Sequence, residues 1–198
     1  MCPLFHVHNV TAILVGGTPG TGKSEVAAIL AERLKIKVIS LGDLSKKAGC
    51  IAEEDTERDT EIIDEDCLVD AIIDTLEGES DRVIIEGHYI DLVPYSSVER
   101  AFVLRTHPAT LKERLTSRGY SKEKVAENVE AEVIGVCQMD AIESFGEPKV
   151  FEIDTTDLTP TETADKIVEL MKPRARSPRY DWMELLENEG RLDKFLSD

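Results

Sequence analysis

A glycine-rich loop near the start of the sequence restricts the possible folds of this 198-residue chain more than any other feature. Residues 17–24 read GTPGTGKS and match the pattern G-x-x-x-x-G-K-[ST]. The run VTAILV at residues 10–15 is short, mostly apolar and rich in β-branched side chains, which is typical of a buried strand. Apolar residues then recur at helical spacing, at Val26, Ile29, Leu30 and Leu34. The sequence therefore predicts a strand, a tight loop and a helix that begins near Lys23.

Each part of this loop suits a phosphate group. Glycines allow successive backbone N–H groups to turn inward around an anion, and the following helix points the positive end of its dipole at the same place. Lys23 supplies a positive charge for the β- and γ-phosphates, and the Ser24 hydroxyl is a ligand for Mg²⁺. The pattern arises by chance in about one chain in a hundred of this length. We therefore expect a nucleoside triphosphate and Mg²⁺ to bind here.

The rest of the chain alternates between strand and helix patterns. Further strands are expected at residues 37–41, 82–86, 101–105 and 150–153. Helical patterns separate them, the longest running from Val125 to Cys137, and a last helix is expected over residues 160–171. Such alternation predicts an α/β protein whose parallel sheet carries helices on both faces.

Composition limits the class of protein. With 41% hydrophobic and 32% charged residues, the chain suits one globular domain, or one domain with a small appendage. The 23 basic and 40 acidic residues give a net charge of −17, which disfavours broad nucleic-acid binding by the free surface but does not exclude a local basic patch. No apolar run approaches the ~20 residues of a membrane span, so no membrane association is expected.

The cysteines suggest a reducing environment. Cys2, Cys50, Cys67 and Cys137 are scattered, and no CxxC pair is present. We expect neither a disulfide framework nor a zinc ribbon. The N-terminus lacks the basic start of a signal peptide, and a cytoplasmic location fits best.

A second candidate site follows the strand RVIIE at residues 82–86. Glu86 stands at its carboxyl end, where open α/β sheets place ligands, so it is a candidate to hold Mg²⁺ together with Ser24. His88, two residues later, would lie beside the phosphates, although a structural histidine is the alternative.

Arginines form a third group of candidates because they bind phosphate oxygens bidentately and keep their charge. Arg114 and Arg118 are four residues apart on a predicted helix, and Arg105 ends a strand. They could clamp the phosphates of ATP when this segment closes, or they could pair with Glu113 and Glu123 on the surface. Gly119 suits a helix end and a hinge.

Three further segments have two interpretations each. Asp43 could orient an acceptor or cap a helix that begins at Leu44. Residues 53–66 carry nine acids and one arginine, and are either a solvated loop or helix cap, or a surface for a basic partner. The tail after Pro173 begins PRARSPR and continues with an apolar pattern that could pack on the domain or dock a partner. The turn at residues 154–156 is a candidate contact for adenine.

Several of these segments together resemble a known family. They are GTPGTGKS, GDLSKK after the second strand, IIDEDCLVDAI, EGHYID, and FVLRTHPATLKERLTSRGYSKEKVAENVEAEV. Over roughly residues 10–172 they are similar to adenylate kinase isoenzyme 6, the family of the coilin-interacting nuclear ATPase and its archaeal counterparts. The last segment is the most diagnostic, because ordinary adenylate kinases have a different lid.

The resemblance implies a P-loop NTPase three-layer fold with a five-stranded parallel sheet and helices on both faces. The kinase domain would span residues 1–172, with an acceptor-binding segment at about residues 42–65 and a short helical lid without zinc at about residues 117–127. Residues 173–198 would form a separate tail that has no counterpart in the resemblance.

The resemblance also assigns residues, each at a matching position. ATP would be bound by residues 20–25 and by Arg118, the residues of the loop being Gly20, Thr21, Gly22, Lys23, Ser24 and Glu25. Catalysis would involve Lys23, His88 and Arg118. The acceptor would be bound by Gly42, Asp43 and Lys46, the last standing where the family often has arginine. Glu86 stands where the family usually has aspartate, next to the Mg²⁺ position of Ser24.

The activity implied is phosphorylation of AMP by ATP, with ATP hydrolysis and a part in small-ribosomal-subunit maturation and rRNA processing beside a platform ribosomal protein. Two alternatives remain open from the residues. The protein could be an ATP-driven assembly factor with little kinase role, for which the acidic segment and the arginine-rich tail speak. It could also phosphorylate another small acceptor, such as shikimate or a coenzyme precursor.

Overall fold

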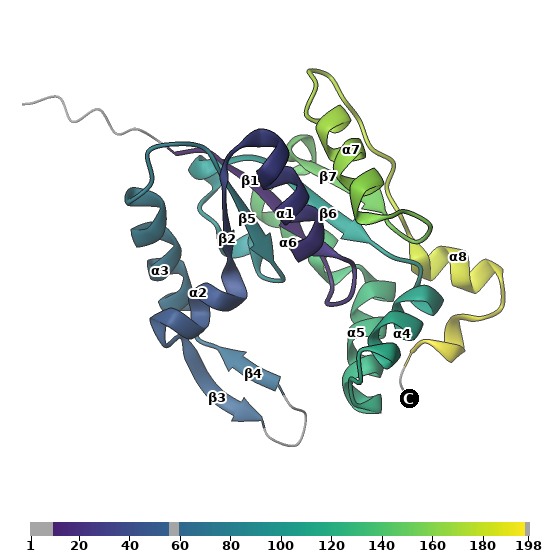
Figure 1. The fold of residues 1–198 in the computed structure, drawn as a ribbon. Coiled ribbons are helices and arrows are strands. Elements are labelled where there is room, and N and C mark those ends of the chain that lie inside the picture. Colours follow the sequence, from purple (N-terminus) through teal and green to yellow (C-terminus); the bar gives the residue numbers. More distant parts are fainter. Residues whose placement is uncertain (1–9, 56–59, 197–198) are drawn as a thin grey trace, which may run out of the picture.

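The computed structural model describes residues 10–55 and 60–196. Five strands form its central sheet, in the order β2 (Lys37–Ser40), β5 (Val83–Gly87), β1 (Ala12–Gly16), β6 (Val98–Arg105) and β7 (Val150–Asp154). All neighbours in this sheet run parallel, so every strand ends at the same edge (Figure 1). The α/β class and the five expected strands are thus confirmed, with small shifts in their bounds.

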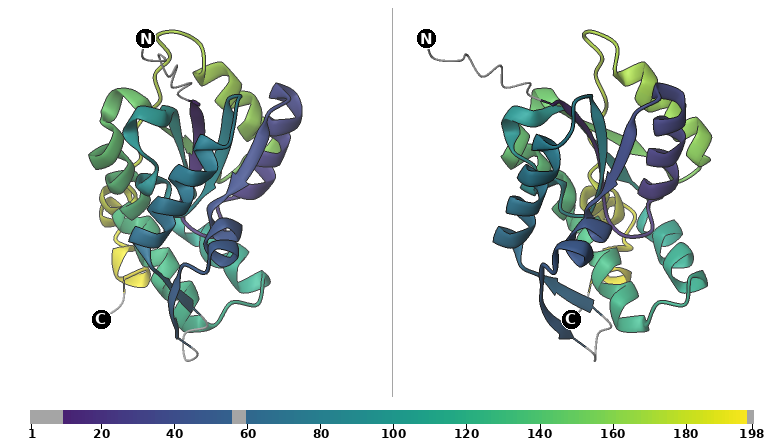
Figure 2. Two further views of the ribbon diagram at one scale, coloured as in Figure 1. Left: turned by 90° about the vertical axis from the view of Figure 1, so that its left-hand side faces the viewer. Right: turned by 60° about the vertical axis from the view of Figure 1, so that its left-hand side comes forward.

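The strands supply two separate cores because successive side chains point to opposite faces. Leu14 and Ile85 belong to the core on which α3 (Glu65–Glu77) and α6 (Val136–Phe145) pack. Their neighbours Ile13 and Ile84 belong to the other core, against α1 (Lys23–Leu34) and α7 (Pro160–Leu170). Figure 2 shows one pair of helices on each side of the sheet. The result is the three-layer arrangement that the sequence predicts.

Two groups of elements extend beyond the carboxyl edge of the sheet (Figures 1 and 2). One consists of α2 (Leu41–Ala48) and an antiparallel hairpin of β3 (Ile51–Asp55) and β4 (Thr60–Ile63). The other consists of α4 (Pro108–Ser117) and α5 (Lys122–Ile134), which share a small core of Leu111, Leu115, Val125 and Val129. These groups lie where the sequence analysis expects the acceptor-binding segment and the lid.

The tail returns along the edge strand β7. The Ser177 hydroxyl accepts a hydrogen bond from Glu152 N at 2.9 Å, and Tyr180 N donates to the Glu152 carboxylate at 3.1 Å. The tail then forms α8 (Trp182–Asn188), in which Trp182 and Leu186 are buried, and a 3-10 turn (Leu192–Lys194). Of the two interpretations of the tail, packing back onto the domain is the one that the structure shows.

Some expectations are wrong in detail. Helix α2 begins at Leu41 rather than Leu44, and Ser40 is its N-cap, so Asp43 lies inside the first turn and does not cap the helix. The pattern from Val125 to Cys137 is broken at Gly135, whose φ of 80° ends α5 and starts α6. Short 3-10 turns at Ile90–Leu92, Tyr95–Ser97 and Glu147–Lys149 complete the described elements.

The acidic segment also differs from expectation. Residues 53–55 and 60–63 belong to the strands β3 and β4, although Asp64 does cap α3 by accepting from Cys67 N at 3.0 Å. A disulfide joins Cys50 to Cys67 and so closes the base of the hairpin, a bond that the scattered cysteines did not suggest. Cys2 lies outside the described residues. Within the described part, no helix is long and apolar enough to cross a membrane.

Candidate functional site

The glycine-rich loop connects β1 to α1 at the carboxyl edge of the sheet. Gly22 precedes the helix with a φ of 96°, a conformation that L side chains rarely adopt. At Gly17 a Cβ would lie 2.4 Å from the carbonyl oxygen of Leu104, so a side chain there would collide with β6. Lys23 reaches back over the loop, and its Nζ donates to the carbonyl of Thr18 at 3.1 Å. The loop therefore has the geometry that the motif requires.

Ser24 and Glu86 meet at the start of α1. Ser24 Oγ donates to Glu86 Oε2 at 3.1 Å, and Glu86 is buried at the end of β5. A hydroxyl and a carboxylate are hard oxygen ligands of the kind that Mg²⁺ takes beside nucleotide phosphates, so the pair fits that metal. Among the described residues, no cluster of three or more His, Cys, Asp or Glu side chains could hold a metal by itself. A magnesium ion here would therefore need water molecules and phosphate oxygens as its further ligands.

Two neighbouring cavities lie above the loop. One of about 280 Å³ is lined by loop residues, by Lys23 and Ser24, and by Arg118 and Tyr120 from the start of the lid. The other, of about 270 Å³, is lined by the far side of the loop, Arg114, Arg118 and residues that follow β7, including Thr155 and Leu158. Arg118 lines both, as do Gly20, Gly22 and Glu25. The first cavity contains Lys23 and Ser24, so its lining suits a triphosphate. The second cavity adjoins it and suits a nucleoside.

The three candidate arginines have different surroundings. Arg118 is exposed, and its guanidinium forms no hydrogen bond or ion pair with any described residue. Arg114 donates to the carbonyls of Thr155 and Thr156, at 2.8 and 3.2 Å, while it lines the second cavity. Arg105 is fully buried and bound to internal partners, so the expectation that it clamps phosphate is wrong. Arg114 and Arg118 do not form the surface pairs with Glu113 or Glu123 that were the alternative.

His88 stands behind the loop rather than in the two cavities. Its Nδ1 lies 3.3 Å from Sγ of Cys137, and its ring packs edge-on against Tyr89, with 4.9 Å between the centroids. Burial lowers the pKa of His88, the charge of Lys23 lowers it further, and a hydrogen bond to the backbone of Gly17 opposes the shift. Burial raises the pKa of the Cys137 thiol to about 12. A neutral imidazole beside a protonated thiol is the resulting state near pH 7.

Lys23 is held in a partly dehydrated position. Burial lowers its pKa, and the positive charge of Arg118 acts in the same direction. Negative charge at Glu86 and Glu132 opposes this shift. Incoming phosphate would act in the same sense as these carboxylates and strengthen the charged form of the lysine.

A buried carboxylate, that of Glu132, joins the loop to the tail, and no sequence motif indicates this role. Glu132 Oε2 accepts from the Thr18 hydroxyl of the loop at 2.6 Å. Its other oxygen accepts from Arg105 Nε, from Thr106 N and from Trp182 Nε1, at 3.0, 2.9 and 3.0 Å. The one available signal was Trp182, which is the only tryptophan of the chain and belongs to the apolar pattern of the tail.

The candidate acceptor residues lie on α2, across the carboxyl edge from the lid (Figure 1). Gly42, Asp43 and Lys46 are exposed and share one side of the helix, because residues three and four apart lie on the same face. None of them lines either of the two cavities above the loop. The structure therefore does not bring these three residues into the cavities above the loop.

The strands, the loop and the strand-end acid together define a P-loop kinase fold. A family model described as an AAA domain matches residues 13–135, which include the loop, the end of β5 and the lid. Solved structures of similar fold include shikimate kinase from Acinetobacter baumannii in complex with shikimate, with a TM-score of 0.61 and 15% identity, covering 82% of this chain and 93% of that one. An uncharacterized protein from Eubacterium ventriosum has a TM-score of 0.52 and 16% identity, with coverage of 80% and 96%. At these identities the likeness concerns the fold alone.

Relatives of higher sequence identity show to which family of P-loop proteins the chain belongs. The "Putative adenylate kinase" of Pyrococcus abyssi is 38% identical over 177 residues, or 88% of this chain and 93% of its own. That of Methanocaldococcus jannaschii is 38% identical over 173 residues, with coverage of 87% and 93%. That of Archaeoglobus fulgidus is 39% identical over 190 residues, with coverage of 93% and 97%. The chain belongs to the family of these archaeal proteins. Because the last match takes in 93% of the chain, it extends past Pro173, so the tail does have a counterpart among the relatives.

Proposed function

We propose that this protein is an adenylate kinase, which transfers the γ-phosphoryl group of ATP to AMP. The observation that carries the proposal is the convergence of Lys23, Ser24 and Arg118 on one cavity of about 280 Å³ above the loop. Membership of the family named for adenylate kinase supports ATP as donor and AMP as acceptor. The exposed helix α2 and its hairpin, across the edge from the lid, supply a place for that acceptor.

The residues act mainly by position and charge, since phosphoryl transfer asks little covalent chemistry of a protein. Backbone N–H groups of the loop and the Lys23 ammonium hold the β- and γ-phosphates. Arg118 approaches the same phosphates from the lid side, and closure of the lid excludes water. Ser24 and Glu86 would hold Mg²⁺, which neutralises phosphate charge and orients the transferred group. Lys46 on α2 is the cation proposed for the acceptor phosphate, with Gly42 and Asp43 beside it.

His88 has a supporting part in this proposal. Its neutral ring lies behind the loop, near Lys23 and Cys137, and does not line the triphosphate cavity. We therefore expect His88→Gly to bind ATP normally but to turn over slowly, because binding depends on the loop. An unchanged turnover number would make His88 a structural residue only.

Product analysis tests the proposed reaction. Purified protein is incubated with ATP, Mg²⁺ and, in separate reactions, AMP, GMP, CMP, UMP or shikimate, and the products are separated by chromatography. ADP formed in equal amounts from ATP and AMP is the expected result. Phosphorylation of another acceptor in preference to AMP would contradict the assignment. Lys46→Gln should raise KM for AMP, whereas Lys166→Gln, on the outer helix α7, serves as the matched control.

A second function is favoured by the acidic hairpin. We propose that the protein also hydrolyses ATP and acts in the cytoplasm in small-ribosomal-subunit maturation and rRNA processing, by binding a basic platform ribosomal protein. The support is that Glu53 and residues 64–66 are exposed acids at the base of the hairpin, and that Ile62 is 47% exposed beside them. Contacts of this kind weaken steeply with salt.

Calorimetry separates this function from the kinase reaction. A basic ribosomal protein is titrated into the kinase with and without AMP, at low and high salt. Because the acids belong to the acceptor side, AMP should weaken the complex, and the partner should weaken AMP binding by the same factor. Absence of a complex at low salt, or an affinity indifferent to Asp64→Asn and Asp66→Asn, would leave only the kinase.

A further inference from the structure

A basic segment, residues 172–180, lies along the outer edge of the sheet. It reads KPRARSPRY and carries Lys172, Arg174, Arg176 and Arg179 without a single acid, in a chain whose net charge is −17. Arg179 fixes it in place by donating to the Val150 carbonyl and to the Glu152 carboxylate, each at 3.1 Å. We call it the basic strap.

The strap and the start of β7 line a groove of about 690 Å³. Its lining combines three arginines and Ser177 of the strap with a short apolar floor; the floor residues are Pro148, Val150, Phe151 and Ala175. Among the described residues that line it, Glu147 is the one acid. A groove of this size with one wall of guanidinium groups suits an extended anionic chain more than a single small ion.

Two of these arginines are available to a ligand. Arg174 and Arg176 are exposed, and neither side chain forms a hydrogen bond or ion pair with any described residue. Arg174 also has a φ of 63°, the left-handed region that is uncommon for residues other than glycine. Arg174 and Arg176, with one residue between them, both line the same groove. Unpaired guanidinium groups are suited to bind phosphate oxygens bidentately.

An exposed aromatic ring contacts a residue that lies, in the sequence, between two residues that line the groove. Tyr95 is 58% exposed, and Nζ of Lys149, the residue between the floor residues Pro148 and Val150, lies 3.7 Å from the centroid of its ring. Lys149 also donates to the carbonyls of Tyr95 and Val98, at 3.1 and 2.7 Å, so its charge is fixed there. Aromatic rings next to a cationic groove are the arrangement on which single-stranded nucleic acids stack their bases.

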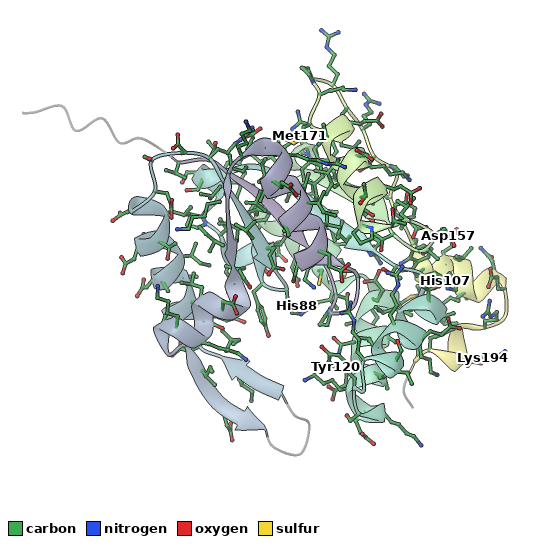
Figure 3. The ribbon with its side chains drawn as sticks, viewed as in Figure 1. His88, His107, Tyr120, Asp157, Met171 and Lys194 are labelled. Carbon is green, nitrogen blue, oxygen red and sulfur yellow. A yellow bond between two sulfur atoms is a disulfide. The ribbon has the colours of Figure 1, made fainter. Side chains whose placement is uncertain are left out.

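We propose that the basic strap and its groove bind the phosphate backbone of a single-stranded nucleic acid, with Tyr95 available to stack a base. Arg174 and Arg176 contact successive phosphates, while Arg179 mainly anchors the strap. The groove begins at Val150, the first residue of β7, whereas the phosphate loop follows the last residue of β1. In a parallel sheet the first residue of one strand and the last residue of another lie at opposite edges. In Figure 3, Met171, the residue before the strap, lies at the end of the molecule away from His88. Nucleic acid and ATP therefore bind independently.

Fluorescence anisotropy with a labelled ten-nucleotide RNA tests this site in the full-length protein. The test variant is Arg174→Gln/Arg176→Gln, and the charge-matched control is Lys35→Gln/Lys166→Gln, which removes two exposed cations from the α1 and α7 side. The test variant should bind the RNA between about 10-fold and 100-fold more weakly at 50 mM salt, and its slope of log Kobs against log[salt] should be shallower by about 1.4. The control should retain wild-type affinity to within about twofold, and saturating ATP should not displace the RNA from any of the proteins.

Four outcomes would overturn the proposal. They are equal affinity of wild type and test variant, equal weakening in the control, displacement of the RNA by ATP, and binding of polyglutamate as tight as that of RNA. The last outcome would make the groove a docking site for acidic peptides. Phosphoryl transfer by the test variant checks its fold and should equal that of wild type, because neither arginine lines the triphosphate cavity. A Tyr95→Ala variant that binds RNA more weakly, with an unchanged salt slope, would further support base stacking.

Discussion

Replacing Trp182 by phenylalanine tests whether the tail holds the phosphate loop in place. Trp182 is buried, and its indole Nε1 donates to Glu132 Oε1 at 3.0 Å. The other oxygen of the same carboxylate accepts from the Thr18 hydroxyl of the loop at 2.6 Å. The Glu132 side chain of α5 thus connects Trp182 of α8 to Thr18 of the loop.

The size of the effect follows from this geometry. A hydrogen bond to a buried charged group contributes about 1.5–3 kcal/mol. Arg105 Nε and Thr106 N still donate to Glu132 when the indole is lost, so the carboxylate keeps partners and the loss should fall near the lower limit. The smaller ring leaves a cavity that adds about 1 kcal/mol. We therefore expect Trp182→Phe to lower the free energy of unfolding by about 2–3 kcal/mol.

Urea unfolding of a double-mutant cycle isolates the bond from the cavity. The cycle combines Trp182→Phe with Glu132→Gln, and the expected coupling energy is about 1–2 kcal/mol. Because the same carboxylate holds Thr18, KM for ATP should also rise a few-fold in Trp182→Phe. If the two energies add to within about 0.5 kcal/mol and KM is unchanged, the hydrogen bond does not couple the tail to the loop, and Trp182 is only a packing residue.

The remaining predictions concern the loop and its surroundings. Lys23→Ala should lower kcat at least about 10³-fold in the coupled assay without unfolding the protein, since it removes the charge on the transferred phosphate. Near wild-type turnover would contradict this. Cys137, with a thiol pKa of about 12, should resist iodoacetamide at pH 8 in the native protein and react in denaturant, as mass spectrometry will show. Because the pKa of His88 is lowered in the folded protein, the unfolded chain takes up this proton at a higher pH, and the free energy of unfolding should fall as the pH drops below about 6.5. His88→Asn should flatten that part of the stability profile measured by urea unfolding. An unchanged slope would show that His88 is not the cause. Reduction of the disulfide between Cys50 and Cys67, across 17 residues, should cost about 3 kcal/mol in the same assay, and no loss would mean that the bond is marginal.

The sheet was predictable because each of its strands can be recognised from its own consecutive residues. Each buried strand is a short apolar run bounded by polar residues, and each covering helix has its own period, so the order of elements follows from the sequence. The β3–β4 hairpin was not predictable in this way. Its strands are rich in acids, which have low strand propensity, and they pair with each other rather than with the sheet. Tertiary context therefore decides the structure of this segment.

The same distinction applies to the site. Gly22, Lys23 and Ser24 could be identified because the chemistry of the loop lies in consecutive residues. Arg105 could not be assigned correctly, because its partners Glu132 and Glu152 are 27 and 47 residues away in the chain. From the sequence it is an arginine at the ligand end of a strand, and only packing shows that its charge is already balanced. Because Arg105 is already paired with two carboxylates, its guanidinium is not available to bind a nucleotide.

This contrast between Arg105 and Arg118 bears on how the lid responds to ATP. Arg118 forms no ion pair with the residues that the structure describes, and its charge lowers the pKa of Lys23, so the two cations repel each other across the cavity. A triphosphate between them would outweigh this repulsion, because each cation would then face negative charge at shorter range than the other cation. In the proposed kinase, the lid would accordingly gain its main attraction to the loop only together with the nucleotide. Gly119, with a φ of 80° directly after Arg118, supplies the turn about which this movement can occur. Closure driven by phosphate charge would couple water exclusion to ATP binding, so the acceptor meets an assembled site rather than an open one.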